Sequence, residues 1–155
     1  MANLSVTICG VPFKNPVIAA SGTFGFGREF NELYDIGGIG GVSTKGLTLE
    51  PRLGNPVPRI AESRGVILNA VGLQNPGVEQ VICQELPKLK ECFHKPVMAN
   101  VSGFSVEDYA YTCQRLDSQE QVGWLEVNVQ AGFLLSHSGS HRFCCRTFEC
   151  AYGKG

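Results

Sequence analysis

The chain has 155 residues, a formal net charge of −1 and 43% hydrophobic residues, which is typical of a globular domain with one hydrophobic core. The near-neutral charge gives no reason to expect nucleic acid or an anionic membrane surface as a partner. No run of about 18 apolar residues predicts a transmembrane helix. The first residues lack the basic and apolar regions of a secretory signal, so we expect a cytoplasmic protein.

The seven cysteines are distributed poorly for a disulfide framework. Their number is odd and no secretory context is visible, so reduced thiols are predicted. The early cysteines are scattered through apolar or helical-looking segments, whereas the late ones are crowded: the first group is Cys9, Cys83, Cys92 and Cys113, and the second is Cys144, Cys145 and Cys150.

The first part of the chain predicts a hairpin followed by a strand–helix–strand unit. Short apolar runs bounded by glycine and proline are typical of strands, and uninterrupted ones are typical of buried parallel strands. The predicted elements are a hairpin of residues 4–8 and 11–13 with its turn at Gly10, a strand over 17–20, a small-residue loop over 21–27, a helix over 28–35 and a strand over 41–45.

The second part continues the alternation after an irregular segment, residues 46–68, that is rich in proline and arginine. Asn75 and Pro76 predict a helix start, with Asn75 as the cap and Pro76 at the first helical position. Ser105 resembles the first residue of a capping box. The predicted elements are strands over 59–62 and 66–69, a helix from 75 to about 86 that resumes over 88–93, a strand over 96–101, a helix over 105–116 and a strand over 124–129.

A hairpin followed by repeated strand–helix units predicts an α/β protein with a parallel sheet. Two architectures remain open on periodicity alone. A doubly wound open sheet is complete at this length, whereas a (β/α)8 barrel needs roughly 250 residues and is only about half present. Both architectures bind ligands at the C-terminal ends of the strands, so candidate ligand-binding residues are expected in the loops that follow the strands.

Small or polar residues follow each predicted strand. Taken singly, a glycine-rich turn, a loop lysine or a turn-rich helix entry needs no ligand. An asparagine inside an apolar strand, however, is costly to bury unless it is hydrogen-bonded. Lys45, Asn69, Asn100 and Asn128 therefore predict one polar site. The Lys45 ammonium suits a carboxylate or the negative charge of a reduced cofactor ring.

The blocks at these strand ends carry a family resemblance. They are residues 20–27 (ASGTFGFG), 44–48 (TKGLT), 51–59 (PRLGNPVPR), 69–77 (NAVGLQNPG) and 125–129 (LEVNV). In this order they resemble the class 1 dihydroorotate dehydrogenases, most closely the NAD-linked 1B type. The family consists of FMN-containing (β/α)8 barrels that oxidise dihydroorotate to orotate in pyrimidine synthesis. The resemblance implies an incomplete TIM barrel, with the N-terminal hairpin and about four β/α units.

The resemblance also implies site residues and partners. The FMN contacts fall on Ser21, Lys45, Gly46, Asn100 and Asn128. The dihydroorotate or orotate contacts fall on Lys45, Asn69, Ala70, Val71, Gly72, Leu73 and Asn128. Members of the 1B type work with a second subunit that carries FAD and a 2Fe–2S cluster, and they pass electrons to NAD⁺. An oligomeric parent enzyme is expected.

The match breaks after Val129. In the family the strand continues Ser-Cys-Pro-Asn and the cysteine is the base, but here Ala131 occupies that position. Alanine cannot accept a proton, and loss of a general base costs about 10²–10⁴-fold in rate. We expect residues 1–129 to be the N-terminal half of the FMN-binding barrel. Residues 130–155 are expected to be an aberrant, non-native or disordered tail from a shifted frame or gene-model fault, with little or no catalysis by the chain.

Two alternatives remain. The first is a non-catalytic half barrel that binds FMN, orotate or the electron-transfer subunit. The second is a structural zinc site in the tail, because a His-x₃-His pair can chelate a metal. The adjacent cysteines there lack the usual ligand spacing, so no metal site is expected. The tail residues concerned are His137, His141, Cys144, Cys145 and Cys150.

Overall fold

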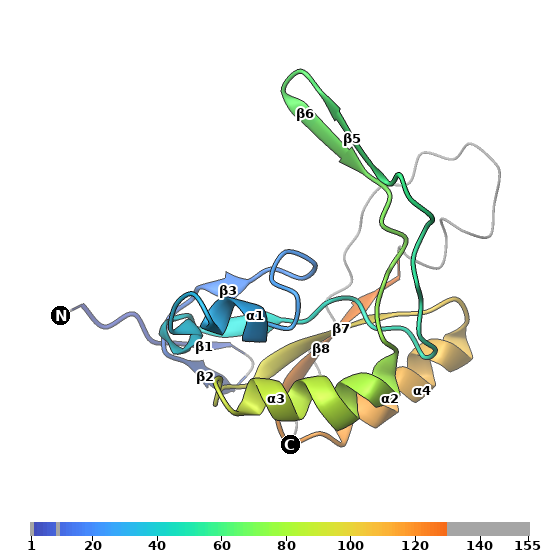
Figure 1. Cartoon of the computed structure of the whole chain (residues 1–155). Helices are drawn as coiled ribbons and strands as arrows, with labels where there is room; N and C mark the ends of the chain where they lie inside the picture. The colour runs from blue at the N-terminus through green and yellow to red at the C-terminus, as the bar shows by residue number, and fades with distance from the viewer. Residues whose placement is uncertain (1, 9, 130–155) are drawn as a thin grey trace.

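The computed structural model describes residues 2–8 and 10–129. Its centre is a parallel sheet of four strands (Figure 1). The strands lie in the order β3 (Ile18–Ala19), β4 (Gly41–Ser43), β7 (Val97–Ser102) and β8 (Val122–Asn128). Each new strand is thus added on the same side of the preceding one. A doubly wound sheet reverses its order at a switch point, so this progression is that of a barrel segment, as predicted.

The helices pack on one side of this sheet, and Figure 1 shows α2, α3 and α4 along it. Two clusters of buried side chains fill the space between, one around Val101 and Leu116 and the other around Val42 and Phe93. The helical elements are α1 (Arg28–Asn31), a 3₁₀ turn η1 (Ile36–Gly38), α2 (Val78–Gln80), a π turn η2 (Val81–Glu85), α3 (Leu86–Lys90) and α4 (Val106–Asp117).

The predicted N-terminal hairpin is confirmed as the antiparallel pair β1 (Val6–Ile8) and β2 (Val11–Phe13), with Gly10 at a φ of 81° in its turn. Phe13 of β2 stacks on Trp124 near the start of β8, with ring centroids 4.6 Å apart. Aromatic pairs of this kind bury a large apolar area. The hairpin thereby attaches to β8 near its N-terminal end, away from the loops that follow the strands.

Two predicted helix starts and ends are wrong. The helix expected over 28–35 ends at Asn31, and Asp35 instead caps the 3₁₀ turn by accepting a hydrogen bond from the Gly37 amide at 2.8 Å. The helix expected to begin at Asn75 and Pro76 begins at Val78, without a side-chain cap. The physical reason is that the Asn75 side chain points inward and bonds the loop after β4.

The helix predicted in two pieces is continuous from Val78 to Lys90, with a π turn in its middle. The Leu86 amide bonds the Val81 carbonyl, five residues earlier. Pro87 follows and has no amide to donate to the preceding turn, which favours a widened turn at this place. The cap at Ser105 is confirmed, because its hydroxyl accepts a hydrogen bond from the Asp108 amide at 3.1 Å.

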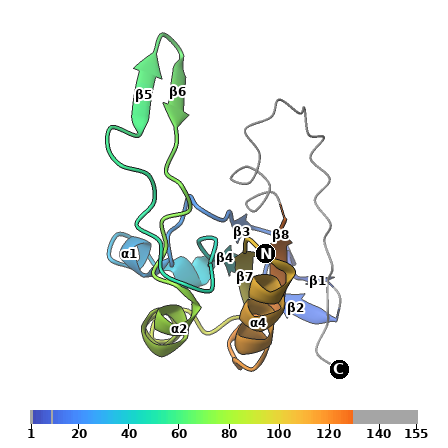
Figure 2. The same ribbon diagram turned by 90° about the vertical axis from the view of Figure 1, so that its right-hand side faces the viewer.

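The strands predicted over 59–62 and 66–69 form a second antiparallel hairpin, β5 (Ile60–Ser63) and β6 (Val66–Asn69). It stands away from the sheet and the helices in both views (Figures 1 and 2). All its strand residues are exposed, including Ile67 and Leu68. In the described part of the chain, no helix has the length and apolarity needed to cross a bilayer.

Cys83, Cys92 and Cys113 carry free thiols. Burial and the nearby Asp117 carboxylate raise the pKa of the Cys113 thiol, which favours the neutral, unreactive form. Cys9 and the cysteines of the tail lie outside the described residues.

Candidate functional site

The candidate site lies on the sheet face that the helices do not cover. On β7, Val97, Ala99 and Val101 belong to the hydrophobic core against the helices. Successive strand residues point to opposite faces, so Asn100 and Ser102 point to the other side. The register places Asn100 beside Glu126 and Ser102 beside Asn128 of β8. Polar groups therefore gather at the C-terminal ends of the central strands.

Gly46, in the loop after β4, lies next to the polar side chains of β7. A Cβ atom added to Gly46 would lie 3.1 Å from Asn100 Oδ1, 3.2 Å from Ser102 Oγ and 3.7 Å from Leu73 Cδ2. The structure thus brings together Gly46, Asn100 and Leu73, which the sequence predicted for one site. The first two distances are shorter than ordinary Cβ contacts, so glycine allows the backbone at residue 46 to pack closely against Asn100 and Ser102.

Two buried oxygens around Gly46 lack a hydrogen-bond partner among the described residues, Asn100 Oδ1 and Ser102 Oγ. An unsatisfied buried polar atom costs roughly 1–3 kcal/mol, so each of these oxygens calls for a partner, such as a ligand or an ordered water molecule. The backbone N–H of Asn100 donates to Thr44 Oγ1 at 3.1 Å, which holds β7 against the residue that follows β4. Ser102 was absent from the predicted site, although its spacing of two from Asn100 was a usable signal.

Lys45 extends from the end of β4 toward the loop after β3. Its Nζ atom lies 3.8 Å from the position that a Cβ of Gly22 would take. Gly22 has a φ of 78°, and Thr23 closes the same loop by bonding the Ala20 carbonyl through its hydroxyl. The lysine and the loop of Ser21, both predicted for the site, are therefore neighbours, and the absence of a side chain at Gly22 leaves room beside the ammonium group.

The segment of residues 69–73 is held in place by backbone contacts. Asn55 donates its amide to the Val71 carbonyl and its Nδ2 to the Ala70 carbonyl, both at 2.9 Å. Gly72 has a φ of 79°, and a Cβ there would lie within 2.8 Å of Asn55 atoms. Asn69 ends β6 with an exposed side chain. The structure therefore places Leu73 at Gly46, whereas Asn69 lies at the base of the protruding hairpin, opposite Ile60.

Asn75 is the buried residue that connects this segment to β4. Its Oδ1 accepts hydrogen bonds from the amides of Thr48 and Gly77, at 3.1 and 2.9 Å. Its Nδ2 donates to Thr48 Oγ1 and to the Leu73 carbonyl, at 2.9 and 2.7 Å. Leu73 has a φ of 55°, a left-handed conformation that a branched side chain rarely adopts. Asn75 therefore holds Leu73 in a costly conformation next to Gly46.

Asn128 ends β8 beside Ser102. Its carbonyl accepts a hydrogen bond from the Tyr109 hydroxyl of α4 at 2.7 Å. Two residues earlier, Glu126 accepts a hydrogen bond from the Ser43 hydroxyl at 2.9 Å. Ala131, at the predicted base position, and the proposed metal ligands of the tail lie outside the described residues.

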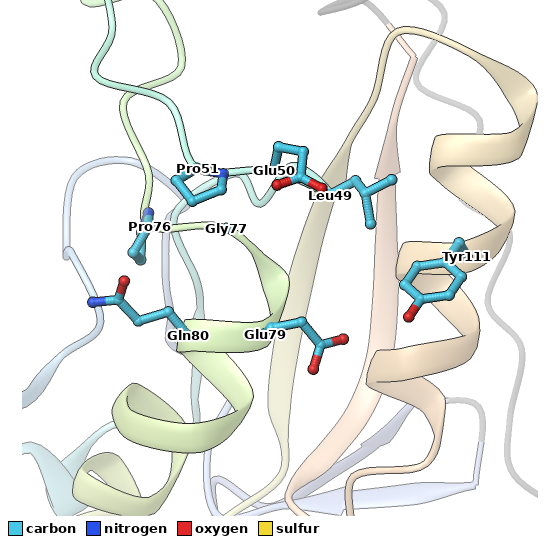
Figure 3. Close-up of a pocket in the computed structure, with 8 residues that line it drawn as sticks. All are labelled: Leu49, Glu50, Pro51, Pro76, Gly77, Glu79, Gln80 and Tyr111. Atoms are coloured by element: carbon cyan, nitrogen blue, oxygen red, sulfur yellow. The ribbon is translucent and has the colours of Figure 1, made fainter.

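A separate groove of about 550 Å³ lies between the loop after β4, the start of α2 and α4 (Figure 3). None of the predicted site residues lines it. Its Glu79 carboxylate accepts a bidentate pair of hydrogen bonds from the Arg115 guanidinium, at 2.6 and 2.7 Å. The hydrogen bond from Arg115 lowers the pKa of Glu79, and the same contact raises the pKa of Arg115. This acid is already paired, so the groove is not the centre of the polar site.

The fold and the site together define a class: a β/α barrel segment with a polar ligand site at the C-terminal ends of its strands. Residues 3–132 match the family model for dihydroorotate dehydrogenase. The chain belongs to this family.

Its curated relatives include the catalytic subunit of dihydroorotate dehydrogenase B (NAD(+)) from Listeria innocua, 46% identical over 129 residues, covering 83% of this chain and 42% of that protein. The corresponding subunit from Bacillus pumilus is 48% identical over 126 residues, covering 81% and 40%. The chain therefore spans about two-fifths of the length of these relatives.

Solved structures show the same likeness. Dihydroorotate dehydrogenase from Eimeria tenella in complex with ferulenol superposes with a TM-score of 0.61 at 26% identity, over 81% of this chain and 36% of that one. This likeness confirms the predicted fold class, a partial TIM barrel.

Proposed function

We propose that this chain carries the flavin- and pyrimidine-binding half of a dihydroorotate dehydrogenase, the enzyme that oxidises dihydroorotate to orotate in pyrimidine synthesis. The observation that carries the proposal is the cradle at Gly46. There, two buried oxygens without partners among the described residues, Asn100 Oδ1 and Ser102 Oγ, lie against the backbone of Gly46, which carries no side chain. Such a cradle fits a flat ligand with hydrogen-bonding edges, and FMN is such a ligand.

Each residue then has a role that its chemistry supports. Gly46 and the loop of Ser21 let the FMN ring and backbone approach each other closely, while Asn100 and Asn128 offer amide donors and acceptors. The Lys45 ammonium offers positive charge to the flavin and to the substrate carboxylate. FMN, when bound, supplies the acceptor for the hydride that leaves the substrate. The protein's own task is to hold two flat molecules against each other.

The substrate segment is proposed to be residues 69–73, together with Lys45 and Asn128. The support comes from Leu73, which the Asn75 side chain holds against Gly46. Dihydroorotate and orotate carry a carboxylate and several carbonyl and N–H groups. Exposed backbone groups and the Asn69 side chain supply matching donors and acceptors.

Turnover by this chain is proposed to be very slow or absent. Ala131 stands at the position where the family carries its cysteine base, and alanine cannot take up the substrate proton. Loss of a general base alone costs about 10²–10⁴-fold. The chain is therefore proposed to bind the ligands of the reaction and to convert them at most very slowly.

The wider assignments follow the relatives. Their name, the catalytic subunit of an NAD(+)-linked enzyme, supports a second subunit as partner and NAD⁺ as final acceptor. The family resemblance implies that this partner is an electron-transfer subunit with FAD and a 2Fe–2S cluster. A cytoplasmic location and an oligomeric parent enzyme are also proposed, the first from the sequence and the second from the family resemblance. The alternative, a half barrel that only binds FMN, orotate or this subunit, differs in one point: it has no turnover at all.

The test is direct. The purified 155-residue chain is mixed with FMN, desalted, and examined for the flavin absorption band; orotate formation from dihydroorotate is then followed by its ultraviolet absorbance. We expect retained flavin and no orotate above the rate of free FMN. A colourless protein would contradict the binding assignment, and orotate formation at an enzymatic rate would contradict the role given to Ala131.

A further inference from the structure

Strands β4 and β8 are connected by a side-chain hydrogen bond although they are not neighbours. The strand β7 lies between them. The Ser43 hydroxyl of β4 nevertheless donates to Glu126 Oε2 of β8 at 2.9 Å. Strands two apart in a flat sheet are separated by about 9–10 Å. The bond therefore exists because the sheet curves and the long glutamate reaches across the concave side.

Both partners lie on the face of the candidate site. Ser43 is aligned with Met98 of β7, and Glu126 is aligned with Asn100. The residue before Ser43, Val42, points into the core against the helices. Ser43 is 3% exposed, so its hydroxyl needs an acceptor within the protein. A carboxylate is a strong acceptor, since hydrogen bonds to ionised groups are shorter and stronger than neutral ones.

We call the Ser43–Glu126 hydrogen bond the bridge. Ser43 lies two residues before Lys45, and Glu126 lies two residues before Asn128. Glu126 and Asn128 share a face because side chains alternate along β8. We propose that Ser43 and Glu126 are positioning residues, which set the separation of Lys45 and Asn128 and so the fit of the flavin and the pyrimidine between them. This inference rests on the proposed function.

The bridge is proposed to act through Lys45 and Asn128 and not by contacting a ligand itself. If β4 and β8 separate slightly, Lys45 and Asn128 no longer reach the same molecule. The hydrogen bond is partly buried and has a carboxylate acceptor, so its loss is expected to matter more than that of an exposed neutral bond. We expect this loss to be measurable as a change of several-fold in ligand affinity.

The experiment measures the affinity of the full chain for FMN and for orotate, by flavin fluorescence and calorimetry, in matched variants. Ser43→Ala and Glu126→Ala are expected to weaken both affinities about five- to tenfold. Glu126→Gln keeps an oxygen that accepts the serine hydroxyl, and it is expected to stay within about threefold of the parent chain. Glu120→Ala removes an exposed carboxylate paired with Lys90 and serves as the control, with unchanged affinity.

A double-mutant cycle separates positioning from general loosening. In a Lys45→Ala background, Glu126→Ala should add less than about twofold to the loss of orotate affinity, because its target is already gone. A merely structural role would leave the two losses multiplicative. Circular dichroism confirms that each variant is folded.

The possible failures differ. If the parent chain binds FMN and orotate but Glu126→Ala binds equally well, the bridge has no positioning role while the proposed function stands. A fully multiplicative loss with Lys45→Ala overturns the positioning role in the same way. If the parent chain binds neither ligand, the proposed function fails and the inference fails with it.

Discussion

The two faces of β7 differ in how their side chains are satisfied. Val97, Ala99 and Val101 are fully buried among apolar side chains against the helices. Asn100 and Ser102 alternate with them and are equally buried, but each keeps an oxygen without a partner among the described residues. One strand thus has a face whose contacts are complete within the chain and a face whose contacts are incomplete.

The helix-facing side chains of β7 stabilise the fold, whereas its polar side chains are those proposed to bind a ligand. Apolar burial contributes about 25 cal/mol per Å² and supports the fold, whereas a buried unpaired polar atom costs free energy until something bonds it. Natural proteins tolerate such costs mainly at functional sites. Substitutions on the two faces should therefore have opposite consequences for folding and for ligand affinity.

The largest expected effect is on the helix-facing side. Phe93 is fully buried in the cluster with Val42 and Val97. Phe93→Ala leaves a large cavity and should lower the free energy of unfolding by about 3–5 kcal/mol, measured by urea denaturation. Phe104, which is 41% exposed, is the matched control, and its replacement by alanine should cost less than about 1 kcal/mol. Equal costs would show that the helix-facing cluster is not the core.

The next effect concerns the residue that joins the two regions, Asn75. Asn75→Ala leaves the Thr48 and Gly77 amides and the Leu73 carbonyl without their partner, and should cost about 2–4 kcal/mol. Asn75→Asp keeps the oxygen that accepts from the two amides but cannot donate to the Leu73 carbonyl. It should therefore be destabilised less than Asn75→Ala but more than the parent chain. Urea denaturation measures both variants. An alanine variant as stable as the parent would contradict the role assigned to this network.

A comparison of neighbouring residues sharpens the contrast further. Val101→Ala should destabilise the ligand-free chain by about 1–3 kcal/mol, because it opens a cavity in the core. Ser102→Ala, one residue along, removes a buried hydroxyl without a described partner and should be neutral or slightly stabilising, within about 1 kcal/mol. Thermal and urea unfolding of the two variants would reveal the difference. A Ser102→Ala variant that loses as much stability as Val101→Ala would remove the distinction between the faces.

The smallest effect is on the exposed ion pair of the groove. The hydrogen bond from Arg115 lowers the pKa of Glu79 in the folded chain, so the pair stabilises the fold above the usual carboxyl pKa of 4.5. This contribution disappears as the pH falls through the lowered pKa and the carboxylate is protonated. Glu79→Gln should thus lower the urea midpoint slightly at pH 7, and this difference from the parent should shrink as the pH falls below 4.5. A larger difference in acid than at neutral pH would contradict this sign.

Local patterns in the sequence predicted most of the fold because its strands are short apolar runs bounded by turns. The family resemblance assigned Gly46, Asn100 and Leu73 to one site, and the structure brings these three together. Asn69, which the strand-end pattern assigned to the same site, lies on the protruding hairpin instead. The role of Asn75 was missed because an asparagine before a proline is also a common helix cap. The Ser43–Glu126 bond joins residues 83 positions apart, and no local pattern indicates such a pair.

The helix-free face of the sheet is proposed to be a flavin site, and an FMN titration tests this assignment. FMN is titrated into the parent chain and into Asn100→Ala by following the quenching of flavin fluorescence, with both proteins shown to be folded. The account predicts saturable binding of one FMN per parent chain and a loss of about tenfold or more in affinity in the variant. Equal affinity in the two proteins, or no binding to the parent chain, would contradict it.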